Sequence, residues 1–151
     1  MSTTTEMTAT TTQVYQLFIR ATPEAIWEAI TSPEFTERYF YGARIETTAE
    51  RRITHSPDDP ALSGEDEIFE WDPPRRLAHR WHSKWNPELS AEEPSRVSWE
   101  IDPRDDGTCL LTVVHDQLEG APKTAESVAG PGWMFVLSGL KTLLETGEPL
   151  S

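Results

Sequence analysis

Residues 133–146, WMFVLSGLKTLLET, are the stretch from which the fold is predicted first. Its apolar side chains recur at helical spacing: Trp133, Val136, Leu137, Leu140, Leu143 and Leu144. This i, i+3, i+4, i+7 pattern is typical of a helix that buries one face. A Gly-Pro-Gly sequence at 130–132 precedes the stretch, and Gly147 and Pro149 follow it as boundary signals. We therefore predict one long amphipathic helix, with Phe135 on its wet face.

Two further helix starts lie upstream, and both are built in the same way. Thr22-Pro23-Glu24 and Ser32-Pro33-Glu34 each place a hydroxyl at the cap, a proline at the first helical position and an acid in the first turn. These signals predict short helices at 23–31 and 33–40. A strand at 14–19 precedes them.

The middle of the chain reads as a series of short strands. We expect strands at 44–48, 51–55, 67–71, 76–82, 95–101 and 108–116. Turn residues separate the later strands at 72–75 and 103–107, and we expect loops at 56–60 and 87–94 and a helical turn at 123–129. Hairpin connections make antiparallel neighbours. The prediction is an α+β domain with a curved antiparallel sheet of about six to seven strands and its helices on one face.

Length and composition exclude several classes of protein. The 151 residues suit one domain, which we place at 13–148, after a Thr-rich tail at 1–12 that we expect to be disordered. The chain has 26 acidic residues against 13 basic ones, which argues against binding to nucleic acid or to an anionic membrane surface. No apolar run is long enough to span a bilayer. A single cysteine allows no internal disulfide, so we expect a cytoplasmic protein.

Strand alternation predicts which side chains face the interior. The inward sets on three strands are Leu77, His79 and Trp81, then Val97, Trp99 and Ile101, then Leu111, Val113 and His115. On the strand at 67–71 we place Phe69 and Trp71 inward, because Glu70 and Asp72 then face water.

The aromatic side chains are the best functional signal. Large rings with a few polar tips suit a pocket for an apolar ligand. The predicted lining is Tyr39, Phe40, Phe69, Trp71, Leu77, His79, Trp81, Val97, Trp99, Leu111, Val113, His115, Trp133 and Leu137. The alternative is a solid aromatic core without a cavity. Of the other tryptophans, Trp27 is expected to be structural and Trp85 to lie near an acidic loop.

The polar residues give little support for catalysis or for a metal. His79 and His82 point to opposite faces of a strand, and His115 and Asp116 point apart, so neither pair can act together. For His79 and His115 we favour core positions with satisfied nitrogens. Cys109 is expected to be a buried small hydrophobe. We expect no catalytic residue, no metal and no cofactor.

A run of acidic residues at 65–67, followed by Glu70 and Asp72, lacks the glycine and the spacing of a calcium loop. We interpret it as a solvated edge strand.

The pieces that carry a family resemblance are 21–30 (ATPEAIWEAI), 72–77 (DPPRRL), 111–116 (LTVVHD), 132–133 (GW) and 137–147 (LSGLKTLLETG). In this order and spacing, over about residues 13 to 148, the chain resembles the START-like (SRPBCC, helix-grip) superfamily. Within it, the chain is similar to the domain named for the activator of the ninety-kilodalton heat-shock chaperone's ATPase. The resemblance implies a helix-grip fold, which commonly encloses a pocket. It also implies a choice among small-molecule binders, co-chaperones and cyclase-like enzymes.

Three functional hypotheses follow. The first is a soluble protein that binds a hydrophobic or aromatic small molecule, such as a lipid or polyketide, between the sheet and the last helix. The second is a co-chaperone that binds the heat-shock chaperone through its surface. The third is a cyclase or hydrolase that uses His79 or His115, and we rank it last because no acid–base pair converges. The exposed Phe135 additionally suggests a partner surface, such as a homodimer interface.

Overall fold

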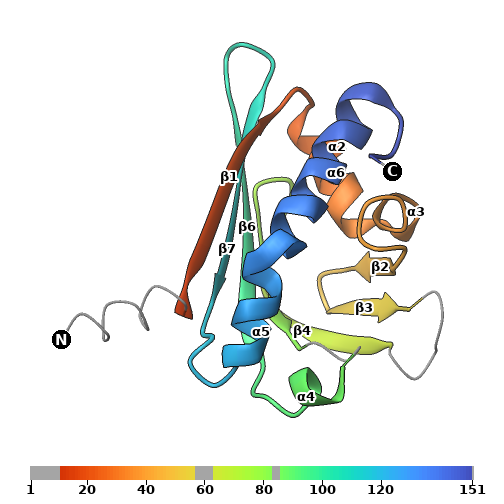
Figure 1. Ribbon diagram of the computed structural model, residues 1–151. Helices are drawn as coiled ribbons and strands as arrows, with labels where there is room; N and C mark the ends of the chain where they lie inside the picture. Colours follow the sequence, from red (N-terminus) through yellow and green to blue (C-terminus); the bar gives the residue numbers. More distant parts are fainter. Residues whose placement is uncertain (1–10, 57–62, 83–85, 151) are drawn as a thin grey trace.

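The computed structural model describes residues 11–56, 63–82 and 86–150. In this part of the chain a seven-stranded antiparallel sheet curls around a long helix, α6 (Trp133–Thr146) (Figure 1). The α+β helix-grip prediction is therefore confirmed. The predicted tail at 1–12, the loop at 56–60 and Trp85 lie largely or wholly outside the described residues. None of the described helices is long and apolar enough to cross a membrane.

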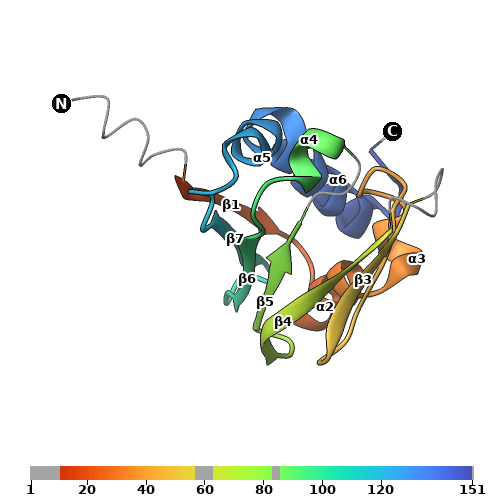
Figure 2. The same ribbon diagram turned by 90° about the horizontal axis from the view of Figure 1, so that it is seen from below.

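The strand order in the sheet is β1-β7-β6-β5-β4-β3-β2. The strands are β1 (Gln13–Ile19), β2 (Arg44–Thr47), β3 (Arg51–His55), β4 (Gly64–Asp72), β5 (Arg76–Trp81), β6 (Ser95–Pro103) and β7 (Cys109–Asp116). Strands β2 to β7 follow one another as antiparallel neighbours, and β1 joins the far edge beside β7. Figure 2 shows that the helices α2, α3 and α6 lie on the concave side of this half-barrel.

The first two helices start at the predicted residues. Helix α2 (Pro23–Thr31) begins after Thr22, whose hydroxyl accepts a hydrogen bond from the Ala25 amide at 3.1 Å. Helix α3 (Pro33–Thr36) is shorter than the predicted 33–40. The chain turns back after it because Tyr41 and Gly42 both adopt positive φ angles, 54° and 79°. Just before this reversal, Tyr39 is buried and Phe40 is partly buried.

Helix α6 has the predicted bounds. It ends at Gly147, which adopts a left-handed φ of 81° and donates its amide to the Leu143 carbonyl at 2.8 Å. Helix α5 (Pro122–Ser127) and a π-helical turn, η2 (Val128–Gly132), lead directly into it. The expected loop at 87–94 instead contains helix α4 (Pro87–Ser90), because the Asn86 side chain caps its first turn.

Two predictions for strand β4 were wrong. It is not an edge strand, since it pairs with β3 on one side and β5 on the other. The register also shifts between Ile68 and Glu70, so a bulge changes the alternation within the strand. Phe69 consequently lies on the outer face with 49% of its surface exposed, while Ile68 and Trp71 pack against the core.

Candidate functional site

Four aromatic side chains meet between the sheet and α6, and we call them the aromatic cluster: Phe40, Trp81, Trp99 and Trp133. Trp133, on the first turn of α6, contacts the other three rings. Its ring centroid lies 5.5 Å from that of Trp81, 5.6 Å from that of Trp99 and 6.2 Å from that of Phe40. These spacings and the tilted or edge-on angles are favourable for aromatic pairs. The prediction that tryptophans from two strands and the last helix converge is confirmed for Trp81, Trp99 and Trp133.

His79, on β5, is fully buried beneath Trp99. The indole Nε1–H of Trp99 donates to Nε2 of His79 at 3.0 Å. An indole can only donate, so Nε2 is the unprotonated nitrogen and Nδ1 carries the hydrogen. That Nδ1–H donates to the Arg80 carbonyl at 2.9 Å. Both nitrogens of the imidazole are therefore used.

His115, on β7, repeats this arrangement with Trp133. The Trp133 indole donates to Nδ1 of His115 at 3.0 Å, so the proton of the neutral imidazole is on Nε2. Nε2–H lies 2.8 Å from the hydroxyl oxygen of Ser95, to which it donates. The two hydrogen bonds of His115 together connect α6, β7 and β6 in the interior.

Burial and these hydrogen bonds keep both imidazoles neutral. Desolvation lowers the pKa of His115 from 6.5 to about 4 and also places the pKa of His79 well below its usual value. Neither ring keeps a free lone pair to abstract a proton from a substrate. The expectation of core histidines with satisfied nitrogens is confirmed. Each histidine orients the indole ring of its tryptophan partner.

A buried charged group lies beside the aromatic cluster. The Arg52 guanidinium, on β3, lies 5.3 Å from the Trp81 ring centroid and 5.8 Å from that of Phe40, within the range of cation–π contacts. Arg52 is only 6% exposed, and Asp66 on β4 is similarly buried. Their nearest charged atoms, Nη1 and Oδ2, are 4.0 Å apart. Arg80 approaches Asp66 more closely, with Nε at 3.2 Å from Oδ1.

The remaining predicted lining residues form the surrounding core. Leu77, Val97, Leu111, Val113 and Leu137 are all buried.

Two of the predicted aromatic residues have other partners. Tyr39 is buried, and its hydroxyl donates to the Ala29 carbonyl at 2.8 Å. The polar group of Tyr39 therefore binds to helix α2. Burial raises the pKa of that hydroxyl. Trp71 packs edge-on against Trp27 at 5.0 Å, which gives Trp27 the structural role expected for it.

Sequence reasoning missed Arg52, Asp66 and Ser95 as interior residues. The predicted strand began only at residue 67 and left Asp66 out, whereas in the structure β3 and β4 place Arg52 directly opposite Asp66. Opposite charges at facing positions can be buried together, and the acidic run hid this possibility.

Cys109 is buried as predicted, with its sulfur 3.3 Å from the Ala21 carbonyl. Among the described residues, no group of three or more His, Cys, Asp or Glu side chains could hold a metal ion.

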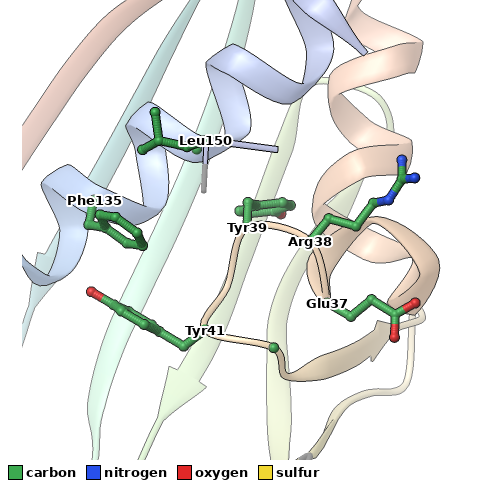
Figure 3. A pocket seen from close by; sticks show the side chains of 8 residues that line it. Glu37, Arg38, Tyr39, Tyr41, Phe135 and Leu150 are labelled. Carbon is green, nitrogen blue, oxygen red and sulfur yellow. The ribbon is translucent and has the colours of Figure 1, made fainter. Parts of the chain in front are cut away.

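Phe135 lies on the outer side of α6, as expected, but it is not alone. It stacks on Tyr41 with ring centroids 5.4 Å apart and an interplanar angle of 23°. Figure 3 shows the two rings facing each other. Together with Leu150 they line a pocket of about 150 Å³. Tyr41, Phe135 and Leu150 are 60%, 38% and 45% exposed, and we call them the outer patch.

Solved structures with similar folds come from several bacteria. The protein MLL2253 from Mesorhizobium loti is 22% identical, with a TM-score of 0.68 over 89% of this chain and 96% of that chain. CalU16 from Micromonospora echinospora is 21% identical, with a TM-score of 0.68 over 91% and 76%. The Aha1 dimer from Colwellia psychrerythraea is 16% identical, with a TM-score of 0.64 over 90% and 97%. At these identities the likeness concerns the fold alone.

No curated protein matches the chain significantly. A family model does match it, over residues 20–145, and this model is described as "Activator of Hsp90 ATPase homolog 1-like protein". The match includes the helices, six of the seven strands and every residue of the aromatic cluster. The protein therefore belongs to the family of Activator of Hsp90 ATPase homolog 1-like proteins.

Proposed function

We propose that this protein binds a hydrophobic or aromatic small molecule, such as a lipid or polyketide, at the partly exposed end of the aromatic cluster. The observation that carries the proposal is that the four side chains of the cluster differ in their exposure to solvent. Trp99 and Trp133 are almost fully buried, whereas Phe40 and Trp81 are only partly buried. Rings that are fixed at one end and accessible at the other suit a concave apolar site with few polar groups.

The fixed end is supported by hydrogen bonds. Trp99 and Trp133 are each held by an imidazole, whereas the Phe40 side chain has no polar group and makes only ring–ring and cation–π contacts. A ligand can displace Phe40 from its contacts with Trp81 and Trp133 without breaking a hydrogen bond of that side chain. We place the ligand between Phe40 and Trp81, under the edge of α6. We also propose a cytoplasmic location, which the single buried Cys109 supports.

Tryptophan fluorescence tests this proposal. The protein is titrated with two neutral probes, decanol and naphthamide, and the naphthamide titration is repeated by calorimetry. We expect saturable binding that is weakened in Trp81→Leu and retained in Trp27→Phe, a matched control that removes an indole outside the cluster. Far-UV circular dichroism verifies the fold of both variants. Absence of binding for every probe, or equal loss in both variants, would contradict the proposal.

The outer patch supports a second candidate, a protein-binding function. Exposed aromatic side chains that gather at a hollow mark interaction surfaces. We propose that a second copy of this chain docks on Tyr41 and Phe135, with the Hsp90 chaperone as the alternative partner. Sedimentation with and without Phe135→Ser tests the homodimer, and a chaperone ATPase assay with the same variant tests the alternative. A monomer without effect on the ATPase would refute both.

A further inference from the structure

The Arg52 guanidinium holds an unusual position at the partly exposed end of the aromatic cluster. It is buried, flanked by the Phe40 and Trp81 rings, and it donates no hydrogen bond to any residue that the structure describes. A guanidinium carries five N–H donors, which normally find acceptors when they are buried. With respect to the described residues, the donors of Arg52 are therefore available to a bound molecule.

The charge around Arg52 is only partly neutralised. Asp66 is the carboxylate that lies closest to Arg52 among the described residues, but at 4.0 Å it is beyond hydrogen-bond distance, and it is hydrogen-bonded to Arg80 at 3.2 Å. In the part of the chain that the structure describes, two guanidinium groups thus share one carboxylate, which leaves an excess of positive charge there. A cationic ligand would be repelled here, and an anionic group would be attracted.

A second polar group next to Arg52 also lacks a partner. The hydroxyl of Thr47, on β2, is buried and has no hydrogen-bond partner among the described residues. Thr47 lies directly opposite Arg52 in the β2–β3 register, so the two side chains project from the same face of the sheet. An unsatisfied buried hydroxyl costs stability, which makes its position beside an underused guanidinium informative.

We propose that Arg52 and Thr47 bind the carboxylate of the ligand, so that the ligand class is a hydrophobic or aromatic carboxylic acid. This inference rests on the proposed binding function and names the chemistry of that site. The fork of the guanidinium matches the two oxygens of a carboxylate, and the hydroxyl donates a further hydrogen bond. The apolar part of the acid lies against Phe40 and Trp81.

Calorimetric titration with two matched pairs of probes tests the inference. Decanoate is compared with decanol, and naphthoate with naphthamide. The test variants are Thr47→Val and the double variant Arg52→Met/Asp66→Leu, which removes both charges of the buried pair together. The matched control is Arg51→Met/Glu65→Leu, because Arg51 and Glu65 form an exposed ion pair on the same two strands.

We expect the acids to bind the native protein at least about tenfold more tightly than their neutral counterparts. The double variant should lose this preference, Thr47→Val should reduce it, and the control should keep it. Binding of the neutral probes should change by a much smaller factor than binding of the acids in the test variants. If the neutral probes bind and the acids show no preference, or if the preference survives both test variants, the inference is wrong while the proposed function stands. If no probe binds, the proposed function itself fails. Thr47→Val preserves shape and both charges, so it decides the question if the double variant does not fold.

Discussion

Protonation of His115 should make the stability of this protein strongly dependent on pH between 7 and 4. In the unfolded chain the imidazole has a pKa near 6.5, and burial lowers it to about 4 in the folded protein. Between these values the unfolded chain binds more protons, so the free energy of unfolding falls as the pH falls. The penalty is small above pH 6.5, grows as the pH falls toward 4 and reaches its full size below about pH 4. Protonation also removes the acceptor that Trp133 uses.

The magnitude follows from the two pKa values. One pKa unit corresponds to about 1.4 kcal/mol, so the linkage relation gives a loss of about 2 kcal/mol at pH 5 and about 3 kcal/mol at pH 4. His79, whose pKa is also lowered well below 6.5, adds to the loss in the same direction. Against the 5–15 kcal/mol of a typical domain, even the first value is a large fraction.

Urea unfolding at pH 7, 6 and 5, followed by tryptophan emission, measures this loss. The informative variant is His115→Asn, because an asparagine oxygen can accept the Trp133 hydrogen bond but does not titrate in this range. We expect its stability to fall with pH by about 2 kcal/mol less than that of the native protein. His55→Asn, at an exposed position on β3, is the matched control and should behave like the native protein. Parallel pH profiles for the native protein and His115→Asn would refute the reasoning.

Three further predictions concern packing and can be measured by the same urea unfolding at neutral pH. Gly139→Ala should destabilise the protein by about 1 kcal/mol, because the new Cβ would lie 3.1 Å from the Cβ of Tyr39, which the hydrogen bond to Ala29 holds in place. A gain in stability would mean that helix propensity outweighs this contact. Leu140→Ala should cost about 2–5 kcal/mol, since the side chain is fully buried, and a loss below about 1 kcal/mol would contradict the described core. Arg96→Met should cost less than about 1 kcal/mol although Arg96 and Asp116 pair through two hydrogen bonds, because the pair is partly solvated; a larger loss would refute this view.

Local signals explain why the helices could be predicted from the sequence. The bounds of α6 follow from one apolar stripe and from Gly147, which takes the left-handed conformation that ends a helix. The start of α2 follows from the Thr22 cap. Each signal acts within a few residues, so no knowledge of the tertiary structure is needed. Where the same reasoning treated 87–94 only as a loop, it overlooked the same kind of cap at Asn86.

Properties that depend on distant segments were harder to predict. The position of β4 between β3 and β5 is decided by pairings along the whole sheet, and the acidic residues of β4 suggested an edge instead. The bulge between Ile68 and Glu70 shifted the alternation, which placed Phe69 outside. A period-two pattern cannot reveal such an insertion, because one extra residue exchanges the two faces of a strand.

In the candidate site, too, local patterns were predictable and contacts between distant segments were not. Alternation along β5, β6 and β7 correctly placed Trp81, Trp99, His79 and His115 inward. It could not tell that each indole would donate to an imidazole, because these pairs join residues 18 to 20 positions apart through side-chain geometry. Arg52 was missed for a different reason. Its burial depends on aromatic rings from two separate segments, those of Phe40 and Trp81, and on Asp66 across the strand pair.

Two kinds of contact, hydrogen bonds on one side and ring or cation–π contacts on the other, divide the aromatic cluster into a rigid part and an adaptable part. On the rigid side, Trp99 and Trp133 are oriented by hydrogen bonds that cost little because every donor and acceptor is satisfied. On the adaptable side, Phe40 and Arg52 meet Trp81 through ring and cation–π contacts, which depend less on direction. A buried guanidinium that contributed only to stability would be expected to bond its carboxylate directly, because an incompletely paired charge is costly. The 4.0 Å separation from Asp66, together with the unpartnered Thr47 hydroxyl, is instead what a site prepared for an anionic ligand would show.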